Sequence, residues 1–240
     1  MPNPDFDAIS KRPSPLKRAL LWFAKYSILA VIIFLLWNTT VLKYFKILVV
    51  FLHETSHAFA AILTGGHVRN IAVSSTESGV TFVSGGLSAI MYSAGYLGTS
   101  LIGALLIASG NSRKLKRYVL LVLGIILILS TALFVRNLFG ILYGTIAGTI
   151  FIFLYIRDFF FSVYVTDFVG MMCVVYSIYD FLDFLGPGEN DATLLAKLSG
   201  LPSPLIYGTW ITIALVLFIW AFRKSFRSAV RTTGRNSETG

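Results

Sequence analysis

The sequence contains few charged residues and a single cysteine. Charged residues make up 13% of the 240 residues, apolar residues make up 56%, and the mean hydropathy is +0.77. These values lie outside the range of soluble globular proteins. The one cysteine, Cys173, lies in an apolar run, which argues against a disulfide framework and against a thiolate metal cluster. The composition therefore indicates an integral, multi-pass membrane protein.

Seven apolar stretches are long enough to cross a bilayer, because a spanning helix needs about 20 mostly apolar residues. They cover residues 19–37, 43–64, 87–109, 118–135, 138–156, 162–185 and 205–222. The sequence predicts an all-α membrane protein, a polytopic helical bundle of six or seven spans. Around residues 70–86, glycines and alternating apolar residues predict a short β-hairpin or a re-entrant segment.

The basic residues form three clusters beside apolar runs, which argues against nucleic acid as a partner and favours the lipid bilayer. The clusters are Lys11, Arg12, Lys17 and Arg18; Arg113, Lys114, Lys116 and Arg117; and Arg223, Lys224 and Arg227. Basic clusters usually mark cytoplasmic loops. If all three face the cytoplasm, an even number of crossings must separate each pair. Four stretches separate the last two clusters, but three separate the first two. Either one of those three stretches does not cross fully, or one cluster lies on the other side.

The segment His53-Glu54-Thr55-Ser56-His57 has the pattern HExxH. On a helix, residues four apart share a face, so both imidazoles can converge on one ion. Glu54 then projects beside the metal, where its carboxylate can accept a proton from water activated by zinc. A satisfied core histidine is the usual alternative, but ionisable groups are expensive inside a membrane. We therefore predict a Zn²⁺ site with His53 and His57 as ligands and Glu54 as the catalytic base.

Catalytic zinc usually takes three protein ligands, and the third must lie elsewhere. Ala60 and Leu63 exclude the longer pattern in which a third histidine follows the second. His67 lies in a glycine-rich turn and is expected to be a solvated loop residue. Glu77 has a suitable separation from His57, but it lies in a turn-rich segment.

Four aspartates remain as candidates for the third ligand. Asp158 and Asp167 border a connection between two spans, and we interpret them as interfacial charges. Asp180 and Asp183 interrupt an apolar stretch three residues apart, on one helical face. Two carboxylates in a membrane need a cationic partner. We predict Asp180 as the third ligand because it lies deeper in the span, with Asp183 as the alternative.

Several segments resemble the site-2 protease family of intramembrane zinc metalloproteases, in particular its compact peptidase-like membrane branch. The segments are HETSHAFAAILTGGHVRNI, GVTFVSGG, YSAGYLGTSLIGALL, VRNLFGI and YSIYDFLDFLGPGENDA. The resemblance implies that His53 and His57 bind zinc, that Glu54 is the base, and that Asp180 or Asp183 completes the site. The family's aspartate typically lies in a Leu-Asp-Gly motif, whereas neither aspartate here precedes glycine.

The resemblance implies that the protein cleaves membrane-protein substrates within the membrane. We expect residues 19–222 to form a single integral-membrane metalloprotease-like domain. Residues 1–18 form a polar tail, and residues 223–240 a basic tail that we expect to be disordered. The segment around Gly79, Val80 and Thr81 could bind a substrate peptide through a strand edge, although an ordinary turn is the alternative. Asn137 could hydrogen-bond a substrate carbonyl or an oxyanion, although it could instead cap a helix.

Other functions remain open at this point. A pseudo-protease scaffold or chaperone would keep the fold without the chemistry. A metal-binding transporter would need ligands along a path, and three His, one Cys and four Met offer few. A prenyl-protein protease with a glutamate ligand is another zinc enzyme to consider. Diiron lipid oxidases are excluded because they need many more histidines.

Overall fold

The computed structural model describes residues 13–184, 186 and 188–231, and it is mainly helical. The elements in chain order are α2 (Pro15–Leu36), α3 (Thr40–Leu63), β1 (His67–Val73), β2 (Gly79–Ser84), α4 (Ser88–Ala108), α5 (Arg113–Phe134), α6 (Leu138–Arg157), α7 (Ser162–Phe184), α8 (Asp191–Ser199) and α9 (Ser203–Arg231). Within these residues, seven helices are long and apolar enough to cross a membrane, namely all except α8. The predicted all-α membrane fold with a small hairpin is confirmed.

Polar residues at the helix starts explain several of the element boundaries. The Ser14 hydroxyl accepts a hydrogen bond from the Lys17 amide, and Pro15 occupies the first turn of α2. At the other end of the chain, α9 continues to Arg231. The expectation of a disordered tail from residue 223 is therefore wrong up to that point, because the apolar face of α9 continues with Phe226 and Ala229 packed in the core. Residues 1–12 and 232–240 lie outside the described part of the chain.

The hairpin of β1 and β2 is antiparallel and pairs His67 with Ser84 and Val73 with Gly79. The outer edge of β1 is held by the segment between α5 and α6. There the Arg136 amide donates to the Ile71 carbonyl, and the Asn137 side chain both donates to the Val73 carbonyl and accepts from its amide, at 2.7 and 3.1 Å. Among the described strands, β2 pairs only with β1. The outer edge of β2 therefore remains without a partner strand.

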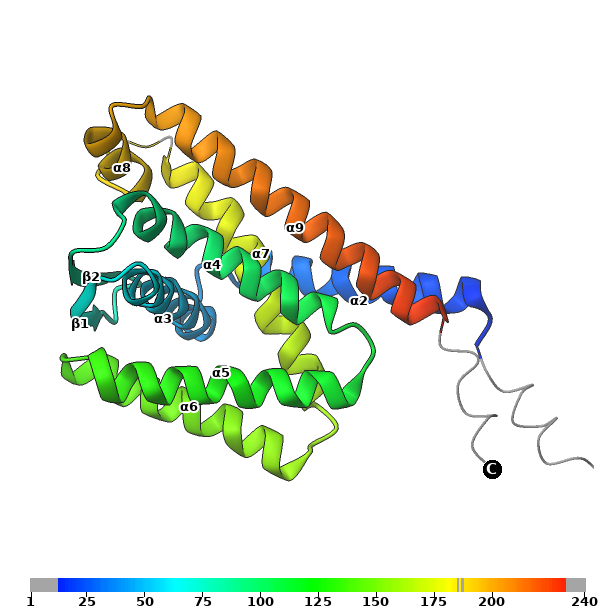
Figure 1. Ribbon diagram of the computed structural model, residues 1–240. Helices are drawn as coiled ribbons and strands as arrows, with labels where there is room; N and C mark the ends of the chain where they lie inside the picture. The colour runs from blue at the N-terminus through cyan, green and yellow to red at the C-terminus, as the bar shows by residue number, and fades with distance from the viewer. Residues whose placement is uncertain (1–12, 185, 187, 232–240) are drawn as a thin grey trace, which may run out of the picture.

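Helix α3 runs across the bundle rather than along it. Figure 1 shows α3 nearly end-on, whereas α4, α5 and α9 extend along the picture. In its apolar stretch, 67% of the residues are buried, against 11% in α2. Because α3 is surrounded by other helices and the hairpin, its polar groups are shielded from lipid.

Candidate metal centre

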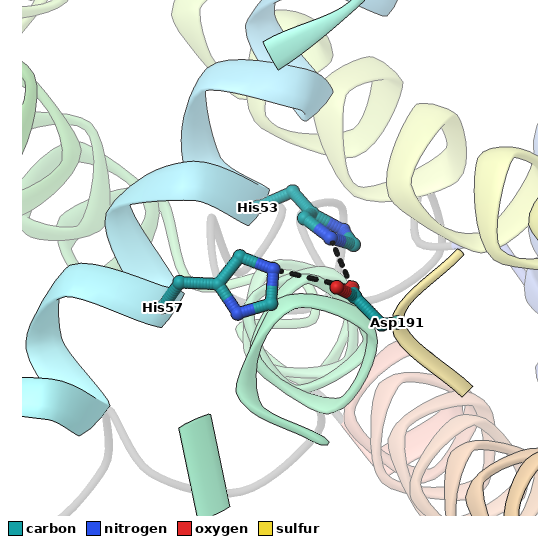
Figure 2. Close-up of side chains that lie close together, drawn as sticks. All are labelled: His53, His57 and Asp191. Carbon is teal, nitrogen blue, oxygen red and sulfur yellow. Dashed lines mark hydrogen bonds and ion pairs between the residues drawn. The ribbon is translucent and has the colours of Figure 1, made fainter. Parts of the chain in front are cut away.

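The two histidines of the HExxH segment lie on one face of α3 and point toward the same carboxylate (Figure 2). The Nε2 atoms of His53 and His57 lie 3.0 and 3.2 Å from the same Oδ2 atom of Asp191. One ligand atom from each of the three residues lies within 4.8 Å of the others. The predicted convergence of the two imidazoles is therefore present, and the structure adds an acidic residue that the sequence did not single out.

Asp191 is the first residue of α8, the short helix between α7 and α9. Asn190 caps this helix, because its side chain accepts from the Thr193 amide while the Thr193 hydroxyl accepts from the Asn190 amide. The capping box fixes the backbone immediately before Asp191 and so helps to aim its carboxylate. The pattern Asn-Asp-Ala-Thr was the available sequence signal, because it predicts a helix start eight residues after Asp183.

The structure brings Asp191, and not Asp180, into contact with the imidazoles. Asp180 lies on α7 and lines the same pocket, but it is outside the cluster of possible metal ligands. Asp183 also lies on α7, and its side chain is outside the described part of the structure. The preference for Asp180 assumed that the ligand comes from a membrane-spanning helix. Instead, the chain leaves α7 and folds back over α3 through α8.

The hydrogen bond of His57 to Met91 indicates that a proton or a metal ion belongs between its Nε2 atom and Asp191. The Nδ1 atom of His57 lies 2.6 Å from the carbonyl oxygen of Met91. A carbonyl can only accept, so Nδ1 must carry the proton, and in a neutral ring Nε2 then presents a lone pair. That lone pair faces a carboxylate oxygen at 3.2 Å. Two acceptors at this distance require a proton or a metal ion between them, so the donor set fits a metal.

The absence of a side chain at Gly95 on α4 leaves the space in which the imidazoles converge. A Cβ atom at this position would lie 2.2 Å from Nε2 of His53 and 2.4 Å from Nε2 of His57. Any larger residue would displace the histidines, since contacts this short do not occur between such atoms. Gly95 belongs to the AGYLG segment that the sequence analysis noted, and its role is to allow this close approach.

The charge state of Asp191 also suits metal binding. Burial by itself would raise the pKa of this carboxyl, but His53 and His57 in their protonated form donate hydrogen bonds to it and attract its negative charge, and this outweighs burial and holds the pKa below its usual range. The carboxylate form is therefore favoured. This is the form that coordinates a metal.

Strand β2 contacts the glutamate of the HExxH segment. The hydroxyl of Thr81 lies 2.6 Å from Oε2 of Glu54 and 3.0 Å from the Glu54 carbonyl oxygen. At Gly79, an added Cβ would lie 2.6 Å from Cγ of Glu54. Glu54 is buried, with 7% of its surface exposed. The hairpin therefore holds a buried carboxylate in one position beside the two histidines.

The pocket around this cluster includes most of the predicted site residues. Its lining comes from α3, β2, α4, α7 and α8 and includes His53, Glu54, His57, Gly79, Val80, Thr81, Asp180 and Asp191. Two other candidates are engaged elsewhere. The Asn137 side chain is bonded to the backbone of Val73 on β1. The Glu77 carboxylate pairs with Lys46 at 2.6 Å.

The fold and the site together define an integral-membrane protein with a buried histidine and carboxylate cluster of metal-ligand type. The chain belongs to the Peptidase M50B-like family, whose sequence model matches residues 26–221, and thus to the site-2 proteases. This is a family of metallopeptidases. No curated protein and no solved structure matches the chain.

Proposed function

We propose that this protein is a zinc-dependent intramembrane endopeptidase that hydrolyses peptide bonds in or near the transmembrane segments of membrane proteins. The observation that carries the proposal is the convergence of His53, His57 and Asp191, with Glu54 fixed beside them. Family membership supports the same reaction class. Asp191 takes the role of third ligand that the sequence analysis gave to Asp180.

The proposed zinc ligands are the two Nε2 atoms and the Asp191 carboxylate, a set of three that leaves a fourth position open, as in catalytic zinc sites. The Met91 carbonyl holds the His57 ring in the tautomer that offers Nε2. A zinc ion bound there would lower the pKa of a water molecule and polarise a peptide carbonyl.

Glu54 is the proposed proton carrier. Its carboxylate accepts a proton from the attacking water and then delivers that proton to the leaving amine. Thr81 donates a hydrogen bond to this carboxylate at 2.6 Å. That contact, together with the close packing of Gly79, keeps the carboxylate beside the ligands, so that little reorganisation is needed during the reaction.

The unpaired outer edge of β2 is the proposed substrate-binding element. A peptide that pairs with this edge becomes extended, and its amide bonds are then accessible to a nucleophile, which they are not in a helix. Residues 79–81 on this strand line the pocket that contains Glu54. Asn137 supports the proposal indirectly, because it closes the other edge of the hairpin and leaves only β2 for a peptide.

The test combines metal analysis with a cleavage assay on the purified protein and a membrane-protein substrate. Wild type is expected to hold one zinc ion per chain and to cleave. His57→Ala is expected to lose both the metal and the activity. Glu54→Gln is expected to keep the metal and to lose activity by about 10²- to 10⁴-fold, which is the usual contribution of a general acid–base residue.

The same variants separate the enzyme from its alternatives. A scaffold or a metal transporter would function equally well with Glu54→Gln, since neither needs a proton carrier. Full zinc occupancy in His57→Ala, or undiminished cleavage by Glu54→Gln, would overturn the proposal.

A further inference from the structure

Helix α9 is the longest helix of the described chain. Its 29 residues extend about 43 Å, whereas the hydrocarbon core of a bilayer is about 30 Å thick. About nine residues of α9 therefore lie outside the core. The charged residues of α9 begin at Arg223 and continue to Arg231, so the segment outside the core is residues 223–231. Figure 1 shows this end of α9 beside the start of α2, far from α8 and the hairpin.

This end of α9 has two different faces. Ala221, Ser225 and Ala229 are buried against the bundle, and the Ser225 hydroxyl accepts a hydrogen bond from Trp22 of α2 at 3.0 Å. The opposite face, which we call the basic face, carries four exposed cations, namely Arg223, Lys224, Arg227 and Arg231. Because successive residues are about 100° apart around a helix, these four lie within about a third of its circumference.

The basic face continues into an apolar surface on the preceding turns of α9. Val216, Ile219 and Trp220 are exposed and line the same groove as the four cations. Tryptophan prefers the boundary between the hydrocarbon and the head groups. The Lys224 ammonium lies 5.1 Å from the centre of the Trp220 ring. The groove therefore changes from apolar to cationic at the depth where acyl chains meet phosphate groups.

No carboxylate in the described part of the chain pairs with the basic face. Helix α9 contains no Asp or Glu, and the ion pairs among the described residues all lie on other elements. Arg113 and Arg117 differ, because both pair with Asp158. In the sequence, residues 1–12 and 232–240 each contain as many basic as acidic side chains, so neither segment brings a net negative charge. The basic face therefore has an excess of positive charge that an external anion can neutralise.

We propose that the groove on α9 is a binding site for an anionic phospholipid. Arg223, Arg227 and Arg231 lie one helical turn apart, and each guanidinium can form paired hydrogen bonds with phosphate oxygens. A cluster of Lys and Arg beside a spanning helix is typical of a site for anionic lipids. Free phosphate would neutralise only the cationic part of the groove, whereas a phospholipid also covers the apolar part with its acyl chains. The site is separate from the pocket and does not depend on the proposed peptidase activity.

Trp220 provides a spectroscopic reporter for this site. The chain has four tryptophans, and Trp220 is 44% exposed, whereas Trp22, Trp37 and Trp210 are at most 8% exposed. The purified full-length protein is reconstituted in phosphatidylcholine vesicles that contain a rising fraction of phosphatidylglycerol with brominated acyl chains. Bromine quenches tryptophan fluorescence only at close range. The reference series uses brominated phosphatidylcholine, which carries a phosphate but no net charge.

In the wild type, brominated phosphatidylglycerol is expected to quench at lower fractions than brominated phosphatidylcholine does. Trp220→Phe should remove this difference, because it removes the reporter and leaves the cations in place. Equal quenching by the two lipids in the wild type would overturn the proposal. A difference that persists in Trp220→Phe would place the lipid elsewhere and would also overturn it.

Two triple variants test whether the basic face is responsible. The variant Arg223→Gln, Arg227→Gln and Arg231→Gln should reduce the preference for phosphatidylglycerol about tenfold or more, since a single hydrogen bond between ionised groups can contribute that factor. The matched control removes three exposed charges at the same end of the bundle, through Lys17→Gln, Lys114→Gln and Arg157→Gln. The control should keep the preference. An equal loss in both variants would mean that net charge, and not this groove, attracts the lipid.

Discussion

Two clusters of ionisable side chains are buried in the described part of this protein, and they differ in whether each hydrogen-bond donor meets an acceptor. Away from the pocket, Asp167 on α7 accepts from Lys25 at 3.0 Å and from Lys116 at 2.6 Å, and its other oxygen accepts from Tyr26 at 3.2 Å. Each contact joins a donor to an acceptor. In the pocket, by contrast, the neutral His57 ring would face the Asp191 carboxylate with its Nε2 lone pair, so this contact needs a proton or a metal ion.

This difference in hydrogen bonding indicates that the Asp167 cluster is structural and that the cluster of His53, His57 and Asp191 is functional. The Asp167 cluster is complete without a ligand, and it connects α2, α5 and α7, with α9 joined through Tyr26 and Ser225. The histidine cluster is complete only with a proton or a metal ion between the His57 ring and Asp191. Burial and ionisable residues alone do not identify a site in a membrane protein. A buried contact between two acceptors, which needs a proton or a metal ion, does.

The largest effect is expected from removing the Asp191 carboxylate, which should weaken zinc binding. Asp191→Ala should weaken zinc binding by about 3–4 kcal/mol, or several hundredfold, because structural zinc sites with four protein ligands bind with about 10–16 kcal/mol in total, which is about 3–4 kcal/mol per ligand. Zinc titration of the purified variant measures this loss. Asp180→Ala is the matched control, since Asp180 lines the pocket outside the cluster. Equal weakening by both variants would return Asp180 to the ligand set.

A substitution in the Asp167 cluster is expected to lower the stability of the fold and to leave metal binding unchanged. Asp167→Asn should destabilise the fold by about 2–3 kcal/mol, because it leaves the fully buried Lys116 ammonium without its counter-charge. Thermal unfolding in detergent measures the change. Asp158→Asn is the control, because the pairs of Asp158 with Arg113 and Arg117 are more exposed and should contribute less than about 1 kcal/mol. If the folded Asp167→Asn protein held less zinc, the two clusters would not be independent.

The smallest of these effects is expected from the contact between the hairpin and Glu54. Thr81→Val removes the hydroxyl but keeps the shape, and should lower kcat about tenfold with little change in KM, since a hydrogen bond to a charged group contributes about 1.5 kcal/mol or more. Thr81→Ser keeps the hydroxyl and should retain activity. A parallel loss in both variants, or a change confined to KM, would mean that Thr81 acts on the substrate and does not position Glu54.

The fold and three of the four proposed site residues could be predicted from local patterns. Apolar stretches of suitable length located the helices, because the bilayer imposes that length on any span. The HExxH segment identified His53, Glu54 and His57, because helical periodicity alone brings residues four apart to one face. The hairpin was visible in its glycines and alternating residues. Each of these inferences depends on contacts between residues that are close in the sequence.

Asp167 shows why the other buried cluster could not be predicted. Its position near a connection suggested an interfacial charge, yet its side chain is only 1% exposed. Its partners, Lys25 and Lys116, come from helices far away in the sequence. No local pattern marks such a pairing, because it depends on how the helices pack.

The sequence by itself determined which segments form the long helices and which histidines converge, since both follow from spacing along one chain segment. Only the tertiary structure decided the rest. Asp191 reaches the imidazoles because α8 folds back from α7, Gly95 makes room because α4 crosses α3 at that residue, and α3 lies across the bundle because other elements surround it. These are contacts between segments distant in the chain, and their energies depend on packing rather than on any periodicity that the sequence displays.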